Sequence, residues 1–357
     1  MTRESVRMVL LGTAGGPGWG ASRRGIASAL VVGDRFYLVD AGEGVGTQLR
    51  AAFPQTSGVA GGSAGPGRGP LDRLRAVFIT HLHSDHVVGL SSILTTGLFN
   101  GLDRADGTVE IWGPGNRGAI PPLSGLPPAP PVVSPDNPTP GTAEMVDLLV
   151  RAHATDYNDR SFDNRKSVPS ECFIGRDVPV PPEFLVDANG DPHPRMSPVS
   201  FYEDDRVRVS VTLVQHAPVF PALAFRFDTD DGAVVFSGDT APSENLVELA
   251  YGADILVHEV IAAEWVDQVF LSPRDEATEG LRAHLLNAHT TIEQVGPLAE
   301  RAGVRTLVLS HIVPADWPEA RWQAVGDAFS GQLVIGRDLD EITMAGKVSS
   351  LSVGVAQ

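Results

Sequence analysis

The 357-residue sequence contains one cysteine, Cys172, so an internal disulfide is excluded. No apolar run approaches the roughly 20 residues that a membrane-spanning helix needs. The first residues carry charge, but no apolar signal segment with a cleavage site follows them. Together these absences predict a cytoplasmic protein that does not associate with a membrane.

Positive charge is also scarce, with 27 Lys and Arg against 44 Asp and Glu and a formal net charge of −17. Proteins that capture RNA by diffusion usually present a basic surface, so this balance argues against a large polyanion as partner. A local basic patch is still compatible with it, because net charge does not report where charges lie. The hydrophobic content of 42% supplies a sizeable core.

Three imidazoles and one carboxylate lie within the segment His81-Leu82-His83-Ser84-Asp85-His86. The apolar run 76–79 before it predicts a buried strand, and the pattern over 87–94 predicts a helix. Because side chains alternate along an extended chain, His81 and His83 project to the same side. Imidazole nitrogens and carboxylate oxygens are ligands of zinc. A polar loop with exposed histidines explains this density poorly, so the segment predicts a metal site.

Other ligand-type residues directly follow apolar strand patterns further along the chain. These are His216, Asp239, His258 with Glu259, and His311, while His289 precedes the helix predicted over 292–302. Function in α/β sheets gathers where strands end, and short strands alternate with helices here. We therefore expect an α/β protein in which these residues meet the first segment. Asp40, which ends the strand predicted over 36–39, either orients the histidine segment or is a turn carboxylate.

Three stretches lack the hydrophobic periodicity of a helix or a strand. The glycine-rich loop 12–18 has no following Lys-Ser or Lys-Thr and no helix, which favours a rim loop beside the site over a phosphate loop. Residues 54–70 hold six glycines and three prolines and are predicted to be a flexible insertion. The proline-dense and then acidic region of about 119–205 is predicted to be a loop-rich insertion that could cover the site.

These motifs, together with Ser237-Gly238-Asp239-Thr240, His289-Thr290-Thr291 and Leu309-Ser310-His311, resemble the metallo-β-lactamase-fold hydrolases. The branch that contains ribonuclease Z, the zinc arylsulfatases and phosphodiesterases is the most similar. The resemblance covers about 6–100 and 205–345. It implies an αββα sandwich, formed as a single domain over 1–357, with two metal ions at one edge.

The resemblance also implies a role for each motif residue. The ligands of the first zinc would be His81, His83 and His216, those of the second zinc Asp85, His86 and His311, and the bridging ligand Asp239. Mn²⁺ or iron could replace Zn²⁺, because these ligand types accept more than one metal. The catalytic residues would be His289, Glu259, which would orient it, and Asp85. His289 could instead be a helix-start residue with no catalytic task, His258 would support the ligands, and His284 would be structural.

The implied reaction is metal-assisted hydrolysis, in which two cations lower the pKa of a shared water and the hydroxide attacks an ester. Because the mid-chain region is acidic and shows no basic tRNA-gripping arm, we expect a small phosphodiester or sulfate ester as substrate first. A tRNA 3′-processing endoribonuclease, ribonuclease Z, is the alternative. A lactonase or carboxylesterase and a non-catalytic binding protein on the same fold also remain, and a homodimer is left open.

Overall fold

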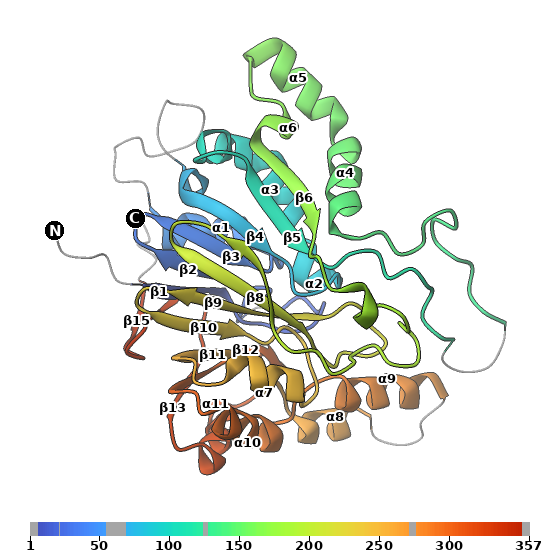
Figure 1. Cartoon of the computed structure of the whole chain (residues 1–357), viewed down its shortest axis with the longest axis vertical. Helices are drawn as coiled ribbons and strands as arrows, with labels where there is room; N and C mark the ends of the chain where they lie inside the picture. The colour runs from blue at the N-terminus through green and yellow to red at the C-terminus, as the bar shows by residue number, and fades with distance from the viewer. Residues whose placement is uncertain (1–5, 21, 55–68, 124–127, 271–275, 352–357) are drawn as a thin grey trace.

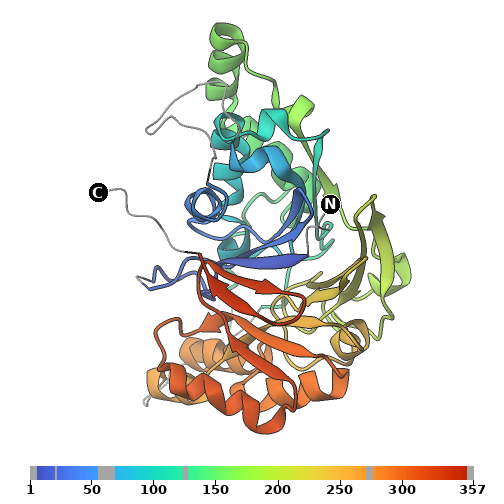
Figure 2. The same cartoon turned by 90° about the vertical axis from the view of Figure 1, so that its left-hand side faces the viewer.

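The computed structural model describes residues 6–20, 22–54, 69–123, 128–270 and 276–351. Two β-sheets lie face to face, and helices cover the outer face of each (Figures 1 and 2). The predicted αββα sandwich is therefore confirmed. Within the described residues, no helix combines the length and the apolar character needed to cross a membrane.

In the described part of the chain, the first sheet has eight strands in the order β15-β14-β1-β2-β3-β4-β5-β6. Its strands are β1 (Arg7–Gly12), β2 (Ala27–Val32), β3 (Arg35–Val39), β4 (Leu74–Phe78), β5 (Val109–Gly113), β6 (Phe173–Asp177), β14 (Asp340–Thr343) and β15 (Val348–Ser350). The second sheet has seven strands among the described residues, in the order β13-β12-β11-β10-β9-β8-β7. Its strands are β7 (Val199–Glu203), β8 (Val207–Leu213), β9 (Leu223–Thr229), β10 (Gly232–Phe236), β11 (Ile255–Ile261), β12 (Thr306–Val313) and β13 (Gln332–Ile335).

The helices fall into two sets that follow the order of the chain. The first set is α1 (Val45–Ala52), α2 (Ser84–Val87), α3 (Leu90–Thr96), α4 (Thr142–Ala152), α5 (Ala154–Asn164) and α6 (Pro169–Cys172). The second set is α7 (Glu244–Ala250), α8 (Ala263–Val269), α9 (Glu276–Asn287), α10 (Ile292–Ala302) and α11 (Glu319–Trp322). In Figure 1, α3, α4, α5 and α6 lie toward the top of the view and α7 to α11 lie toward the bottom.

The core has three layers because both faces of each sheet are covered. Along β1, Met8 and Leu10 pack between the sheets, while Val9 and Leu11 pack toward α1 and α3. Between the sheets, the ring of Phe78 contacts Phe225 and Phe227 at centroid distances of 5.7 and 5.1 Å. Burying each such side chain contributes about 1.5–3 kcal/mol. A strand covered on both faces reads as a continuous apolar run, which is how these strands appear in the sequence.

The sheet topology explains why ligand-type residues gather at one edge. In the first sheet, β3, β4, β5 and β6 run parallel, and in the second sheet β10, β11, β12 and β13 do so. The carboxyl ends of parallel strands lie at the same edge. The segment 81–86 follows β4, and Asp239 follows β10. β11 and β12 run further than predicted, so that His258, Glu259 and His311 lie inside these strands.

Several predictions for the less regular stretches need correction. The region 119–205 holds α4, α5 and α6, as well as β6 and β7, which form the last strand of each sheet. It is thus more regular than its composition suggested, since short edge strands with few apolar residues carry little periodicity. The helix predicted over 87–94 begins earlier, as α2, and is followed by α3. Most of the insertion at 54–70 lies outside the described residues.

Candidate metal centre

The histidine segment leaves β4 in an extended conformation and then enters a short helix. His81 and His83 lie on one side of this segment, with ring centroids 4.7 Å apart. His83 keeps extended backbone angles and is followed directly by α2, whose first turn carries Asp85 and His86. The segment therefore presents its four ligand-type side chains from two directions, as the sequence pattern predicted.

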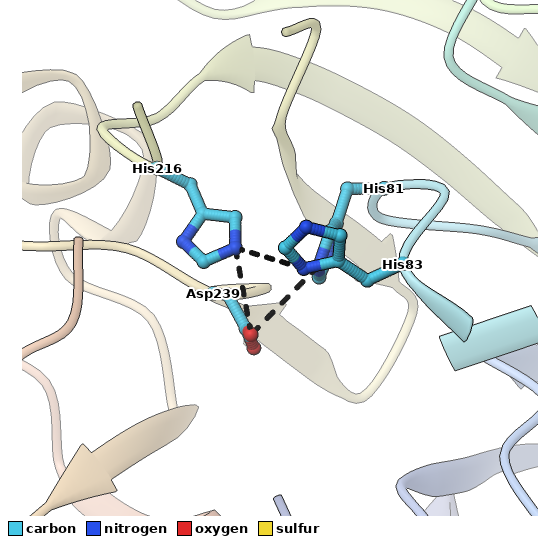
Figure 3. A group of neighbouring side chains, drawn as sticks. All are labelled: His81, His83, His216 and Asp239. Atoms are coloured by element: carbon cyan, nitrogen blue, oxygen red, sulfur yellow. Dashed lines mark hydrogen bonds and ion pairs between the residues drawn. The ribbon is translucent and has the colours of Figure 1, made fainter. Parts of the chain in front are cut away.

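One group of side chains brings residues of both sheets together (Figure 3). It consists of His81, His83, His216 and Asp239, and one ligand atom of each lies within 4.8 Å of the others. Nε2 of His81 and Nε2 of His216 each lie 3.8 Å from Oδ2 of Asp239. Nε2 of His216 lies 3.3 Å from Nδ1 of His83. These atoms converge on one point, which is the geometry that a bound cation requires.

A second group consists of Asp85, His86 and His311. Nε2 of His311 lies 3.3 Å from Oδ2 of Asp85. Asp239 joins the two groups, because its Oδ1 lies 3.3 Å from Nε2 of His86 and its Oδ2 lies 3.3 Å from Nε2 of His311. The structure therefore brings all seven predicted ligands together, with Asp239 between the two groups.

The donor atoms of this cluster fit a divalent metal. Nε2 of His81, Nε2 of His86 and Oδ1 of Asp239 are buried and have no hydrogen-bond partner among the described residues. Buried polar atoms are normally hydrogen-bonded, so partnerless atoms that point at a common centre need another explanation. Imidazole nitrogen and carboxylate oxygen together are a typical donor set for zinc.

Burial sets the protonation state of three of the histidines. It lowers the pKa of His81, His83 and His216, so these imidazoles are neutral near pH 7. Neutral imidazole is the form that binds a metal. These three side chains are therefore ready to coordinate without first losing a proton.

His86 behaves in the opposite way. Burial by itself would lower its pKa, but the carboxylates of Asp239 and Asp40 outweigh burial and raise it well above its usual value. Burial also opposes ionisation of Asp239, yet the nearby His311 and His86 hold its pKa well below its usual range. The site thus concentrates negative charge, which favours a cation.

Asp40 orients the histidine segment, which was one of the two roles that the sequence left open. It is buried, and its carboxylate accepts hydrogen bonds from the backbone N–H of Thr80 at 2.8 Å and from the Thr80 hydroxyl at 2.9 Å. It also bonds Nδ1 of His86 at 2.9 Å, which leaves Nε2 of His86 directed at Asp239. Asp40 has a φ of 58°, an uncommon conformation for a non-glycine residue that is typical of functional sites.

The glycine-rich loop lies against the site, as expected for a rim loop. The backbone N–H of Gly16 donates to Oδ2 of Asp85 at 2.9 Å. A Cβ atom on Gly15 would lie 2.5 Å from Nδ1 of His311, so only glycine permits this close approach. His311 itself has a φ of 47°. The glycine-rich loop and β12, which carries His311, therefore fix each other's position.

His289 and Glu259 form a pair beside the cluster. Nδ1 of His289 donates to Oε1 of Glu259 at 2.9 Å and lies 4.0 Å from Oδ2 of Asp239. The same Glu259 oxygen accepts the backbone N–H of Thr240 at 2.9 Å, which holds the carboxylate in place. Burial opposes the charged imidazole, but Glu259 raises the pKa of His289 to about 9. A cation bound at Asp239 would reduce that shift.

Two further histidines lie near the centre without joining the ligand groups. His258 is buried, and its Nδ1 donates to the Glu259 carbonyl at 2.6 Å. The ring of His284, on α9, lies 5.8 Å from the ring of His216 and 6.1 Å from that of His289. Both residues border the cluster from the second sheet and its helices.

The sequence did not reveal two supporting contacts. Thr80 links Asp40 to the segment, although its position directly before His81 could have suggested such a role. The backbone carbonyl of Ala288 accepts Nδ1–H of His216 at 2.9 Å, which turns Nε2 toward the cluster. A backbone carbonyl leaves no trace in a residue pattern, so no sequence feature pointed to it.

Comparisons with known proteins agree with this geometry. The family model of the metallo-beta-lactamase superfamily matches residues 22–161. A ribonuclease Z of Mycobacterium bovis is 31% identical over 340 residues, which cover 94% of this chain and 98% of that protein.

Solved structures share the fold at low sequence identity. The short form of human tRNase Z superposes with a TM-score of 0.57 at 19% identity and covers 95% of this chain and 99% of that chain. Zn²⁺-bound PqqB from Methylobacterium extorquens has a TM-score of 0.53 at 13% identity and covers 97% of this chain and 100% of that chain. The resemblance inferred from the motifs is thereby confirmed.

Proposed function

Because this chain belongs to the metallo-beta-lactamase superfamily, and within it to the family of its ribonuclease Z relatives, we propose that it is a metal-dependent phosphodiesterase that cleaves RNA at the 3′ end of precursor tRNA. The observation that carries the hydrolytic part of this proposal is Asp239. Its two carboxylate oxygens lie within 3.3 Å of His86 and His311, which belong to the second ligand group, and within 3.8 Å of His81 in the first.

Two divalent cations fit the cluster, with His81, His83 and His216 holding one, Asp85, His86 and His311 the other, and Asp239 between them. When bound, such ions lower the pKa of water and offset negative charge on an anionic ester. Zinc is the first candidate, with Mn²⁺ or iron as alternatives. The partnerless buried atoms of His81, His86 and Asp239 support this assignment.

His289 is the candidate proton donor. Its Nδ1 is held by Glu259 at 2.9 Å, so the other ring nitrogen, Nε2, is left to face a bound ester. A histidine oriented in this way can protonate the leaving oxygen and typically contributes 10²–10⁴-fold to the rate. Glu259 is a positioning residue, since it acts through His289. Asp85 contributes as a ligand that is itself fixed by the N–H of Gly16.

The choice of substrate follows the relatives more than the composition. A ribonuclease Z relative that is 31% identical over 94% of the chain favours the tRNA alternative over the small anionic ester that we expected first. The net charge of −17 is the specific observation that favours the second candidate, a small phosphodiester or sulfate ester that needs no basic surface. The same cluster would serve both substrates.

The test is a substrate panel with metal analysis on the purified protein. Precursor tRNA, bis-p-nitrophenyl phosphate, p-nitrophenyl sulfate and a lactone are assayed with wild type and His289→Ala. We expect about two metal ions per chain in both proteins, tRNA cleavage at the 3′ end by wild type, and loss of turnover in the variant. Cleavage of the small esters without tRNA would establish the second candidate. A folded, metal-loaded wild type that is inert on the whole panel would contradict the proposal.

A further inference from the structure

The rim loop carries a tryptophan that the catalytic proposal does not use. Three backbone N–H groups fix the loop just before it. Ala14 donates to the Arg24 carbonyl at 2.9 Å, Gly15 to the Ile312 carbonyl at 3.2 Å, and Gly16 to Oδ2 of the Asp85 side chain at 2.9 Å. Two of these contacts involve a predicted metal ligand or its neighbour in the chain. Trp19, three residues after Gly16, is therefore tethered to the edge of the metal centre.

The Trp19 side chain is 96% exposed, more than any other large hydrophobic residue that the structure describes. A single exposed apolar side chain would need no explanation. However, Val88 is also 54% exposed, and both residues line one hollow of about 150 Å³. Ser84 and Asp85 lie in the wall of the same hollow. An apolar surface is thus presented to solvent directly beside a candidate metal ligand.

The polar wall of the hollow offers little to read the edge of a ligand. Arg23 lines it, but its guanidinium already donates to the Thr13 hydroxyl at 2.6 Å, the Gly336 carbonyl at 2.6 Å and the Ala315 carbonyl at 3.1 Å. Glu43 and Asp85 are the other two charged residues in the wall. The most exposed side chain at the hollow is the indole of Trp19, and an indole favours a planar aromatic ring as its partner.

We propose that Trp19 stacks on the base of a nucleotide that flanks the scissile phosphate, and so contributes to RNA binding without reading base identity. This inference rests on the proposed function, since it takes RNA as the substrate. Stacking on an aromatic side chain is tolerant of sequence because every base has a π-face. It also needs no positive charge, which explains how a chain with a net charge of −17 could still hold an RNA end.

The experiment compares an intact RNA substrate with versions that carry an abasic nucleotide on either side of the cleavage site. For wild type, we expect one of the two abasic substrates, the one that lacks the base stacked on Trp19, to have a KM about tenfold higher than intact RNA, with little change in kcat. Trp19→Ala should show the raised KM with intact RNA and no further increase with the abasic one. Trp19→Phe should retain most of the effect. Phe162→Ala, which removes another exposed ring (85% exposed) on α5, is the matched control and should behave as wild type.

The outcomes separate the two proposals. If wild type cleaves RNA but Trp19→Ala shows the same abasic penalty as wild type on both sides of the cut, stacking is overturned and the proposed function stands. If wild type does not cleave RNA at all, both fall. Metal content and thermal unfolding of Trp19→Ala should match wild type, because the side chain is almost fully exposed, so a change in KM reports on binding.

Discussion

The two sheets contribute to the candidate metal centre in different ways. The first sheet supplies His81, His83, Asp85 and His86 from one short segment after β4, and a local network around Asp40 holds that segment. The second sheet supplies His216, Asp239 and His311 singly, from or after three different strands. The residues of the first half are therefore close together in the sequence, whereas those of the second half meet only when the strands of the second sheet are in register.

The largest effect should come from the residue that joins the two halves. In Asp239→Asn the amide cannot supply the negative charge that His86 and His311 face at 3.3 Å. We expect loss of bound metal and a fall in ester hydrolysis of about 10³-fold or more. Metal analysis and a hydrolysis assay measure both.

The control for this variant is Asp163→Asn, which changes an exposed carboxylate on α5, a helix that carries none of the candidate ligands. It should leave metal content and activity unchanged. Normal metal content in Asp239→Asn would contradict the view that this residue links the two halves.

The next effect should separate chemistry from metal binding within the second half. His289 could also form a ligand group with Asp239 and His311, but its Nδ1 is held by Glu259 at 2.9 Å. His289→Ala should therefore keep its metal and lower kcat by about 10²–10⁴-fold. Glu259→Gln should lower kcat less, since an amide can still accept the Nδ1 hydrogen bond. Equal metal loss in His289→Ala and Asp239→Asn would instead make His289 a ligand.

A smaller effect should come from the local network of the first half. Asp40→Asn removes a carboxylate that accepts bonds from Thr80 and His86, and we expect a 10–100-fold weaker metal affinity. Competition with a coloured chelator measures this affinity. Thr80→Val should weaken binding in the same direction but less, because the backbone N–H bond to Asp40 remains. Unchanged affinity in both variants would show that the segment holds its shape without Asp40.

The smallest expected effect is the number of protons that the protein releases when it binds metal. In the metal-free protein the pKa of His86 is raised and that of His289 is about 9. Both imidazoles are therefore protonated on both ring nitrogens, and positively charged, at pH 7. Because a ligand histidine must be neutral, Zn²⁺ binding at pH 7 should release about one proton or more, and affinity should weaken as the pH falls. Calorimetry in two buffers with different ionisation enthalpies measures the release, and zero release at pH 7 would contradict the charge state of His86.

The contrast between the two halves also explains how far the sequence could be interpreted. Segment 81–86 was recognisable because four residues of ligand type lie within six positions, and His216, Asp239 and His311 because each follows or lies in an apolar run. The strand lengths were less predictable, since β11 continues through His258 and Glu259 to Ile261 with a register shift on the way. The β6 and β7 strands were missed because edge strands need few apolar residues.

The contacts that orient the ligands were the least predictable. Asp40 could be a turn residue or a partner of His86 until the fold placed its carboxylate 2.9 Å from Nδ1. The carbonyl of Ala288 that turns His216 belongs to a peptide bond and not to a side chain. Such contacts depend on three-dimensional register, which residue order alone does not contain.

The most direct test is a crystal structure of the zinc-loaded protein with anomalous diffraction data. We predict two zinc positions, one within coordination distance of His81, His83 and His216, the other within that distance of Asp85, His86 and His311, with Asp239 contacting both. Zinc bound elsewhere, or a single ion that leaves either group without metal, would contradict a centre shared by the two sheets.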